Sequence, residues 1–434
     1  MSVFFEIAYA AASGSLTLFT GTGFSKAVTE GKAPGWQQLL ELVCTSSMAS
    51  AHLVPELFPA DGGSPLSLEE AAQVIQIQLA NAGRNMHDEI AQIVGPLTPS
   101  GNIDAVRHFL KENKLNIITT NYDKLVEQMV DANTCLSFAP GLPIPRAITN
   151  TNVYHVHGSI DSPTNMVVTA DDYFRFINSE SFFSRKLSTV LHEETIVILG
   201  YSLGDTNLKA ILSDYRGFSK KHFVGGNIFL ASRQPVSQIT KDYYGHCYGI
   251  RVIDQIEIDR FFKMINFYLP EAKKSINTAL PDINEVLFKG HFWTDNYLHK
   301  QYSFFEIVAS VAAIGKSISD PLVVNMLSII IQKKTEFTTI TNAWEQYENL
   351  AEWLVYIGSI LELRGTMLED MYLVAVARSF STMSSSKTPG YSWYAYNAWD
   401  RGWPNIHPAN RALIREYCAG RISNQSAVAL LARA

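Results

Sequence analysis

The stretch from Leu16 to Ser25 constrains the fold more than any other part of this chain. It reads Leu-Thr-Leu-Phe-Thr-Gly-Thr-Gly-Phe-Ser, an apolar run that breaks into two closely spaced glycines. This order predicts a β-strand, a tight turn and then a helix. Gly21 and Gly23 have no Cβ, so the backbone can come close to a ligand, and the first N–H groups of the helix can bind an anion. The pattern is also typical of a strand–turn–helix without a ligand, because Lys26 replaces the third glycine of the dinucleotide-binding fingerprint.

Three later apolar runs also end in residues that suit a binding site. They are Ile117–Asp123, which ends in Asn121 and Asp123; Val153–Gly158, which ends in His157; and Ile196–Asp205, which ends in Gly200, Ser202 and Asp205. Strands that alternate with helices predict a mostly parallel, doubly wound α/β sheet of the Rossmann type. In such a sheet, ligands bind beyond the carboxyl ends of the strands. The four strand ends are therefore expected to face one crevice.

Taken in order, the motifs Gly-x-Gly-x-Ser, Thr-x-Asn-x-Asp, His-Gly and Gly-x-Ser resemble those of the sirtuins, whose members use NAD. The similarity covers about residues 1–265 and is greatest to the prokaryotic sirtuin-like proteins of anti-phage defence, which degrade NAD. The resemblance implies that NAD is the substrate, that Asn121 and Asp123 hold the ribose, the attacking water or the carboxamide, and that His157 is the base. It also implies a set of NAD-binding residues: Gly21, Thr22, Gly23, Ser25, Thr120, Gly200, Ser202 and Asp205.

The residue types at these strand ends suit the cleavage of NAD. Nicotinamide leaves as a neutral base from a cationic glycoside, so the strong general acid of ordinary glycoside hydrolysis is not needed. The site has to stabilise an oxocarbenium-like state and to supply a base for the attacking water, and a histidine suits the second task. The alternative role for Asn121 is structural, as a turn-forming residue at the end of a strand.

His155 and His157 form a His-x-His pair, which is also a metal-ligand pattern. The two side chains are predicted to lie on the same face of their strand, with Asp161 as the nearby third ligand. His-x-His by itself does not select a metal, so no metal is expected. Zinc is not expected either, because the chain has no Cys-x-x-Cys pair. Its four cysteines are Cys44, Cys135, Cys247 and Cys418.

Two departures from the sirtuin pattern bear on the reaction. Sirtuins that deacylate proteins carry a four-cysteine zinc module, which this chain cannot build. They also carry an Asp-Phe-Arg segment after the glycine turn, where this chain has Ala33-Pro34-Gly35-Trp36. Both departures favour hydrolysis of NAD by water over protein deacylation.

The length of 434 residues predicts more than one domain. Residues 1–280 are predicted to form the sirtuin-like domain, with a helical insertion at about 45–112, and residues 281–434 to form a mainly α-helical domain. Pro270 to Pro281 marks the expected boundary. A hydrophobic content of 47% and a net charge of −6 indicate a globular protein and give no general reason to expect nucleic-acid binding.

The leading hypothesis is an NAD glycohydrolase that releases nicotinamide and ADP-ribose in anti-phage defence. The alternatives are a non-catalytic sensor or scaffold that binds NAD or ADP-ribose, and an NAD-dependent protein deacylase. The chain has no P-loop of its own, and the resemblance implies a partner, a HerA-type ring ATPase through which any contact with nucleic acid would be indirect.

The aromatic segment from Trp393 to Trp403 has two interpretations: a packing core with oligomer contacts, or an exposed docking surface for that partner. The contacts of a homo-oligomer, or of the ATPase, are expected to involve residues beyond about 281. No Lys or Arg precedes Lys26, and no apolar stretch reaches the ~18 residues of a membrane span, so a cytoplasmic protein without direct membrane contact is expected.

Overall fold

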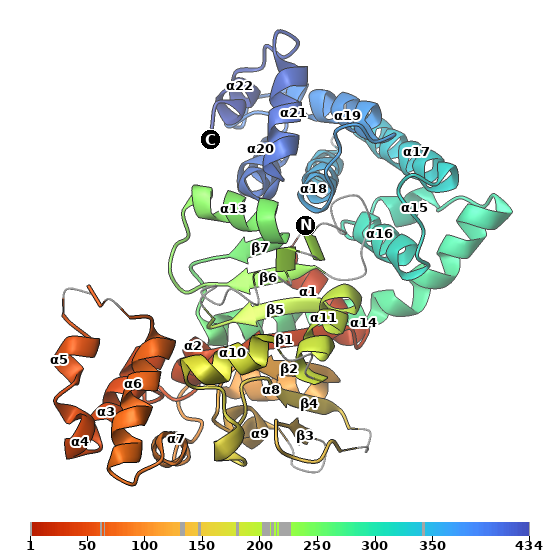
Figure 1. Ribbon diagram of the computed structural model, residues 1–434. Coiled ribbons are helices and arrows are strands. Elements are labelled where there is room, and N and C mark those ends of the chain that lie inside the picture. The colour runs from red at the N-terminus through yellow and green to blue at the C-terminus, as the bar shows by residue number, and fades with distance from the viewer. Residues whose placement is uncertain are drawn as a thin grey trace.

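The computed structural model describes residues 2–60, 63–64, 66–130, 135–145, 149–178, 182–201, 209, 212–213, 215–216, 227–340 and 343–433. Within these residues, seven parallel strands form one sheet in the order β3-β4-β2-β1-β5-β6-β7 (Figure 1). The strands are β1 (Leu16–Thr20), β2 (Leu115–Thr119), β3 (Cys135–Phe138), β4 (Thr151–His155), β5 (Thr195–Leu199), β6 (Ile228–Ala231) and β7 (Ile250–Ile253). This order confirms the predicted doubly wound sheet, whose direction of winding reverses between β1 and β5.

The register of the sheet brings the predicted strand ends to one edge. Thr20 pairs with Thr119 on one side and with Leu199 on the other, and Thr119 pairs with His155. The carboxyl ends of β4, β2, β1 and β5 are therefore level with one another. The crevice that the sequence predicts lies beyond this edge.

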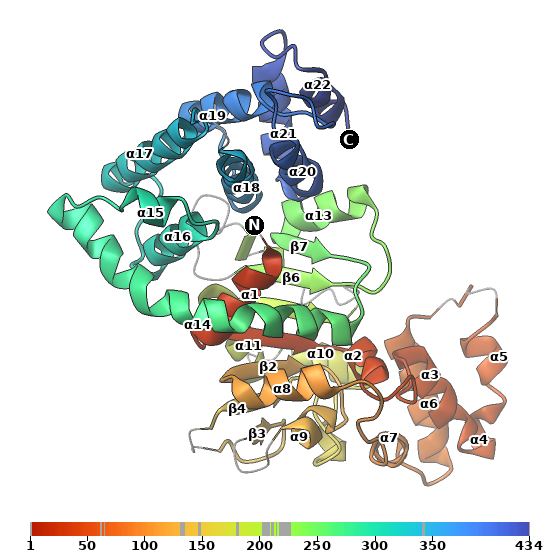
Figure 2. The same cartoon turned by 180° about the vertical axis from the view of Figure 1, so that it is seen from behind.

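Helices cover both faces of the sheet, and β1 and β5 are buried along their whole length. Such two-sided burial explains why these strands are continuous apolar runs and do not alternate with polar residues. Figure 2 shows the face that is covered by α1 (Val3–Ala12), α8 (Asp104–Glu112) and α14 (Ile258–Lys289), with α9 (Leu125–Met129) beside them. The opposite face, turned toward the viewer in Figure 1, carries α10 (Ala170–Asn178), α11 (Phe182–Glu193) and, at its edge, α13 (Gln238–Tyr248).

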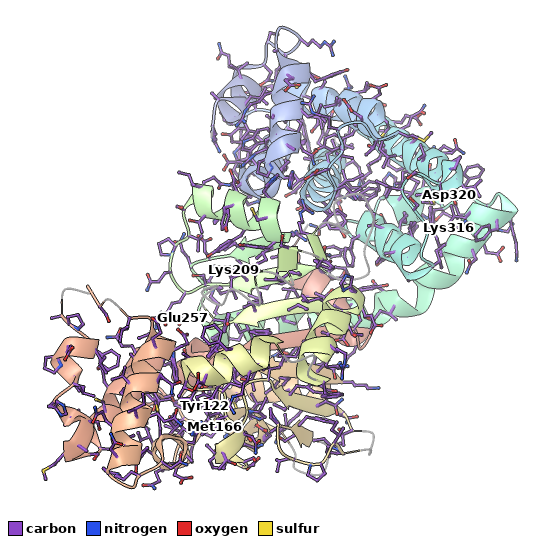
Figure 3. All side chains as sticks on the ribbon, viewed as in Figure 1. Tyr122, Met166, Lys209, Glu257, Lys316 and Asp320 are labelled. Atoms are coloured by element: carbon purple, nitrogen blue, oxygen red, sulfur yellow. The ribbon has the colours of Figure 1, made fainter. Side chains whose placement is uncertain are left out.

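A helical insertion follows β1 and the short helix α2 (Thr22–Ala27), and it lies to one side of the sheet (Figure 1). Its helices are α3 (Trp36–Thr45), α4 (Met48–Ala51), α5 (Val54–Leu57), α6 (Leu68–Asn81) and α7 (Met86–Val94), which share a core of their own. Ser67 and Glu70 form a complete capping box at the start of α6. Three buried residues from the sheet side, Tyr122, Met166 and Val168, complete this core; Figure 3 labels the first two. The apolar residues of α8 belong to the core of the sheet instead.

The C-terminal region is helical, as predicted. It contains α15 (Asp295–Leu298), α16 (Ser303–Ala313), α17 (Pro321–Phe337), α18 (Trp344–Ile360), α19 (Glu369–Ser381), α20 (Trp393–Gly402), α21 (Pro408–Cys418) and α22 (Gln425–Leu431), with a 3₁₀ turn at Trp403–Asn405. Another 3₁₀ turn, Pro163–Asn165, follows β4 in the sheet region. Its core is continuous with that of the sheet. The ring of Phe5 in α1 stacks on Tyr302, with 3.9 Å between the ring centroids.

The segment from Pro270 to Pro281, where the sequence predicts a domain boundary, lies within one continuous helix. Both prolines lie inside α14, a helix of 32 residues that begins on the sheet and ends among the C-terminal helices (Figure 2). Proline removes a helical hydrogen bond and disfavours a helix interior. Packing against α1 and α8 at one end and against α16 and α17 at the other holds α14 together across these positions.

Of the two interpretations of the aromatic segment, the exposed docking surface is wrong. Trp399 and Trp403 are 0% and 1% exposed, and Trp399 donates a hydrogen bond to Ser379 Oγ. Tyr394 is the exposed member of the segment, at 46%. Trp399 and Trp403 face the core because α20 packs along α18, whereas Trp393 and Tyr396 are half-buried. Among the helices that the structure describes, none has both the length and the apolar character needed to cross a membrane.

Candidate functional site

A cavity of about 650 Å³ opens at the carboxyl edge of the sheet, between the sheet and the helical insertion. Six of the predicted site residues line it: Thr22, Ser25, Thr120, Asn121, Asp123 and His157. Apolar side chains of the insertion form another wall, among them Trp36, Leu39 and Val94. Tyr173 and Phe174 of α10 line it as well. We call this cavity the main pocket.

A second cavity, of about 890 Å³, lies next to the main pocket, and Tyr201 lines both. Gly23 and Gly200 line the second cavity, together with Lys26 and Arg233. The predicted residues Ser202 and Asp205 lie outside the described part of the chain.

The side chain of Asn121 is held by two hydrogen bonds. Its Nδ2 donates to the carbonyl oxygen of Gly21 at 2.9 Å and to Ser25 Oγ at 2.8 Å. Because a carbonyl oxygen only accepts, the first bond fixes which end of the amide is the nitrogen. Asn121 Oδ1 is buried and accepts no hydrogen bond from any residue that the structure describes. Asn121 lines the main pocket, so this oxygen is a candidate acceptor for a ligand there.

Asp123 completes the same network. Ser25 Oγ donates to Asp123 Oδ2 at 2.7 Å, and the backbone N–H of Leu125 donates to Oδ1 at 3.1 Å. Burial raises the pKa of Asp123, and these two hydrogen bonds oppose the rise only in part. The pairing of Ser25 with Asp123 gives the serine a role other than capping α2.

The glycines of the first loop are required by a neighbouring loop. Gly23 N donates to the carbonyl oxygen of Gly200 at 2.8 Å, and a Cβ on Gly23 would lie 2.8 Å from Gly200 Cα. Gly200 itself has φ +61°, which favours glycine. The N–H groups of Gly21 and Phe24 also have backbone partners, Leu199 O and Gly21 O. The first turn of α2 therefore offers an anion fewer N–H groups than the sequence predicts.

The two histidines face different surroundings. β4 ends at His155, so the strand alternation that would place both rings on one face stops there. His157 is 5% exposed, lines the main pocket and meets the rings of Tyr173 and Phe176 edge-on, each at 5.3 Å between centroids. Gly158 follows at φ +86°, in a turn where a Cβ would lie 2.7 Å from Met166 Cα.

His155 is completely buried and lies outside the main pocket's lining. Its Nδ1 is 3.0 Å from the carbonyl oxygen of Asn121, and its Nε2 is 2.8 Å from Glu127 Oε1. Lys124 Nζ lies 2.7 Å from Glu127 and 2.7 Å from Asp161. The His155, His157 and Asp161 of the alternative metal site therefore have separate partners and do not converge.

Another group of potential metal ligands lies where α13 meets the C-terminal helices. Ligand atoms of His246, Glu362 and His407 lie within 4.8 Å of one another. Arg216 lies 3.6 Å from Glu362, and His407 Nδ1 accepts a hydrogen bond from Ala409 N. The second contact places the proton of a neutral His407 on Nε2, 3.2 Å from Glu362. The group is thus explained as an ion-pair cluster.

Glu127, Tyr173 and Tyr201 are the site residues that the sequence analysis missed. Tyr201 was identifiable from the sequence, because it directly follows Gly200 at a predicted strand end. Glu127 and Tyr173 lie on helices, and only the packing of α9 and α10 brings them to the site.

Comparison with known proteins agrees with this geometry. Residues 115–253 match the family model of the SIR2-like domain. The chain is 26% identical over 258 residues to Defense-associated sirtuin 2 of Bacillus subtilis. The matched segment covers 57% of this chain and 24% of that protein.

Two relatives named NAD(+) hydrolase ThsA match a shorter segment. The identity is 37% over 103 residues for the protein of Enterococcus faecium and 30% over 102 residues for that of Bacillus cereus. These matches cover 23% of this chain in both cases, and 22% and 21% of the respective relatives. The chain thus spans less than a quarter of the length of these curated relatives.

Proposed function

We propose that this chain is an NAD glycohydrolase that cleaves NAD to nicotinamide and ADP-ribose in anti-phage defence. The observation that carries the proposal is the convergence of Asn121 Oδ1 and His157 on one pocket at the switch point of the sheet. The names of the relatives, defence-associated sirtuin and NAD(+) hydrolase, support the same reaction.

In this proposal, NAD lies across the crevice between β1 and β5. The nicotinamide riboside half occupies the main pocket, and the adenosine half occupies the second cavity. Lys26 and Arg233 line the second cavity and supply positive charge to the phosphates. The apolar wall formed by Trp36, Leu39 and Val94 excludes water from the nicotinamide.

The reaction breaks the bond between the ribose and the nicotinamide nitrogen, whose electron pair leaves with the neutral base. Asp123 stabilises the positive charge that develops on the ribose. Asn121 Oδ1 accepts a hydrogen bond from the attacking water or from a ribose hydroxyl, and His157 takes the proton of the water. Water supplies the hydroxyl group of ADP-ribose, so the atoms balance without a further reactant.

A nicotinamide-release assay tests the proposal. The purified full chain is incubated with NAD, without any peptide, and nicotinamide and ADP-ribose are separated by chromatography. We expect both products in equal amounts, and none from the Asn121→Ala/His157→Ala double variant. Binding of NAD without turnover would indicate the sensor alternative, and release that requires an acylated peptide would indicate a deacylase; either outcome contradicts the proposal.

We further propose that the chain acts in the cytoplasm as a homo-oligomer and pairs with a HerA-type ring ATPase. Uncontrolled hydrolysis of NAD would harm the cell that makes the protein, so the site has to be regulated. Exposed apolar side chains of α14 and the residues after it, such as Phe288 and Phe292 at 56% and 73% exposure, are suitable contacts. Light scattering of the wild type and of Phe292→Ser measures the mass, and a monomeric wild type would contradict the oligomer.

A further inference from the structure

The environment of His155 determines its protonation state. Nδ1 faces the carbonyl oxygen of Asn121 and Nε2 faces a carboxylate oxygen of Glu127. A carbonyl oxygen and an ionised carboxylate only accept hydrogen bonds, so both contacts are favourable only when both ring nitrogens carry a proton. A neutral ring would direct one bare nitrogen at an oxygen.

Glu127 is ionised in this setting. Burial by itself would raise the pKa of Glu127, but the hydrogen bond and charge of His155, together with Lys124, lower it to about 2. Burial, and then the charge of the same carboxylate, raise the pKa of the nearby Cys135 thiol to about 12. The carboxylate charge is therefore the fixed partner of the ring.

We propose that His155 is a positioning residue: paired with Glu127, it holds the backbone carbonyl of Asn121 and thereby fixes the Asn121 amide in the main pocket. The inference rests on the proposed function, because it assigns His155 to the reaction through Asn121. His155 itself does not line the pocket, so its effect has to pass through the loop between β2 and α9.

The charges that face this pair come from several elements. Glu127 and Lys124 belong to α9 and its N-terminal end, Asp161 follows the turn after β4, and Asp123 lies in the loop between β2 and α9. Lys124 also donates to Ser137 Oγ of β3 at 2.6 Å. The two cations His155 and Lys124 thus stand against the carboxylates Glu127 and Asp161, with Asp123 nearby. The local charge is nearly balanced, which makes a buried imidazolium tolerable.

Asn121 is held from two sides as a result. Its carbonyl oxygen accepts from His155, and its Nδ2 donates to Gly21 and Ser25. Tyr122, the next residue, packs into the core of the insertion and donates to the carbonyl oxygen of Val167 at 2.7 Å. Removal of the His155 anchor leaves the Asn121 backbone without its one partner from β4, and a misplacement of about 1 Å can lower a rate roughly 100-fold.

Nitrogen NMR tests the position of Asn121 without reference to turnover. The full chain is labelled with nitrogen-15. A nitrogen-15 spectrum of this sample shows the side-chain amide of Asn121, assigned by its loss in Asn121→Ala. We expect this amide signal to shift or broaden in His155→Phe. An unchanged Asn121 amide signal in a folded His155→Phe protein overturns the proposal whether or not the protein hydrolyses NAD.

Kinetics tests the positioning role. We expect His155→Phe, which keeps the ring volume, to lower kcat for NAD roughly 10- to 100-fold while KM changes less than about threefold. His299→Phe, in the C-terminal region, is the matched control and should leave kcat unchanged. A fall of less than threefold in a folded His155→Phe protein overturns the positioning role, although the NAD glycohydrolase proposal would still stand.

Two substitutions of Glu127 keep the test decisive if His155→Phe does not fold. In Glu127→Gln, the amide can donate to Nε2 of a neutral His155 that still donates from Nδ1 to Asn121, so kcat should stay within about threefold of the wild type. In Glu127→Leu that partner is lost, and kcat should fall roughly tenfold or more. Equal activity of the two variants contradicts the inference. Absence of turnover in the wild type would remove the proposed function, and the NMR result alone would then decide on the positioning role.

Discussion

At the scale of single residues, the site depends on polar side chains that are held by hydrogen bonds and still have one atom without a hydrogen-bond partner among the described residues. Asn121 shows this most clearly, since both of its amide donors are used within the chain and its acceptor is not. An amide fixed in this way presents an oxygen in a defined direction before any ligand arrives. Such preorganisation is what an attacking water needs, because a free side chain would lose its freedom at the moment of reaction.

Asn121→Ala should lower kcat for NAD at least 100-fold. The substitution removes the open acceptor and leaves the Gly21 carbonyl without its Asn121 donor, which should also lower the free energy of unfolding by about 1–3 kcal/mol. Urea denaturation and the nicotinamide assay measure the two effects. Asn325→Ala, on the exposed side of α17, is the control and should change neither. Turnover within threefold of the wild type would assign Asn121 to the turn and not to the reaction.

His157→Ala should lower turnover more than His155→Ala does. His157 lines the pocket and is the proposed base, whereas His155 acts only through the position of Asn121. Removal of the base should abolish detectable turnover, and removal of the positioning ring should leave a measurable rate. Circular dichroism establishes that both variants are folded. If His155→Ala were inactive and His157→Ala kept near-normal turnover, the assignment of the base would be wrong.

The sequence could predict those site residues that directly follow strands. Ser25, Asn121, Asp123 and His157 come within a few positions of an apolar run, and the parallel sheet has to place them at one edge. Glu127 could not be predicted in the same way. Its partner His155 is 28 residues away, and the contact exists only because α9 folds back over the end of β4.

At the scale of elements, the two glycine loops form one packed unit. The loop after β1 and the loop after β5 touch backbone to backbone through Gly23 and Gly200. The sequence pattern for a glycine turn was recognisable, but the expected reason was a ligand. The second loop lies far away in sequence, so its close approach follows from the order of the strands and not from the motif.

Gly23→Ala should be more destabilising than a glycine substitution elsewhere. The new Cβ would lie 2.8 Å from backbone atoms of Gly200, which cannot rotate away, so the two loops have to separate. We expect a loss of about 1–3 kcal/mol in the free energy of unfolding and a parallel loss of turnover. Gly245→Ala is the matched control, because its Cβ would lie 3.8 Å from the nearest atom, and it should be neutral or stabilising. Equal stability of the two variants in urea would contradict the packing argument.

Helix α17 carries a buried cation that should make stability depend on pH. Lys334 is completely buried and bonds to the carbonyl oxygen of Leu298 and to Gln346 Oε1, at 2.8 and 2.7 Å. Burial lowers the pKa of Lys334 to about 7. The unfolded chain then binds more protons at this residue than the folded chain does between pH about 7 and 10, so its contribution to stability rises with pH in that window.

Lys334→Met should remove this dependence. We expect the difference in free energy of unfolding between wild type and variant to change by up to about 1.4 kcal/mol per pH unit above pH 7, in favour of the wild type at the higher pH. Lys333→Met changes the neighbouring, partly exposed lysine and is the control. Urea denaturation at about pH 7, 8 and 9 measures the slope. A difference that stays constant with pH would show that Lys334 is charged in the folded protein throughout.

At the scale of the whole molecule, one hydrophobic core joins the sheet to the C-terminal helices. The sequence predicts a domain boundary between Pro270 and Pro281, and the division into domains at 1–280 and 281–434 remains a prediction. Proline and lysine signals report local preferences, and they miss the packing that carries α14 through both prolines. The tryptophans of the segment that begins at Trp393 could not be assigned to core or surface for a related reason, since composition does not reveal which face of α20 meets α18.

Charged contacts also cross the predicted boundary. The guanidinium of Arg251 in β7, which bonds to Glu6 of α1 at 3.0 Å, lies 6.0 Å from the ring of Tyr356 in α18. Arg411 of α21 pairs with Asp242 of α13. Removal of one partner of such a buried contact is costly, because the charge of the other partner is left unpaired.

A fragment of residues 1–280 should therefore not fold as an independent catalytic domain. It would expose the face of α1 where Phe5 stacks on Tyr302, and it would leave the last part of α14 without α16 and α17. We expect the fragment to be aggregated or to lack a cooperative unfolding transition, and we expect the full chain to unfold in one transition by both fluorescence and circular dichroism. Co-expression of 1–280 with 281–434 is the control and should restore solubility, because it supplies the missing half of the core. A soluble, cooperative 1–280 fragment with the NAD turnover of the full chain would establish the boundary that the sequence predicts and would limit the C-terminal helices to regulation.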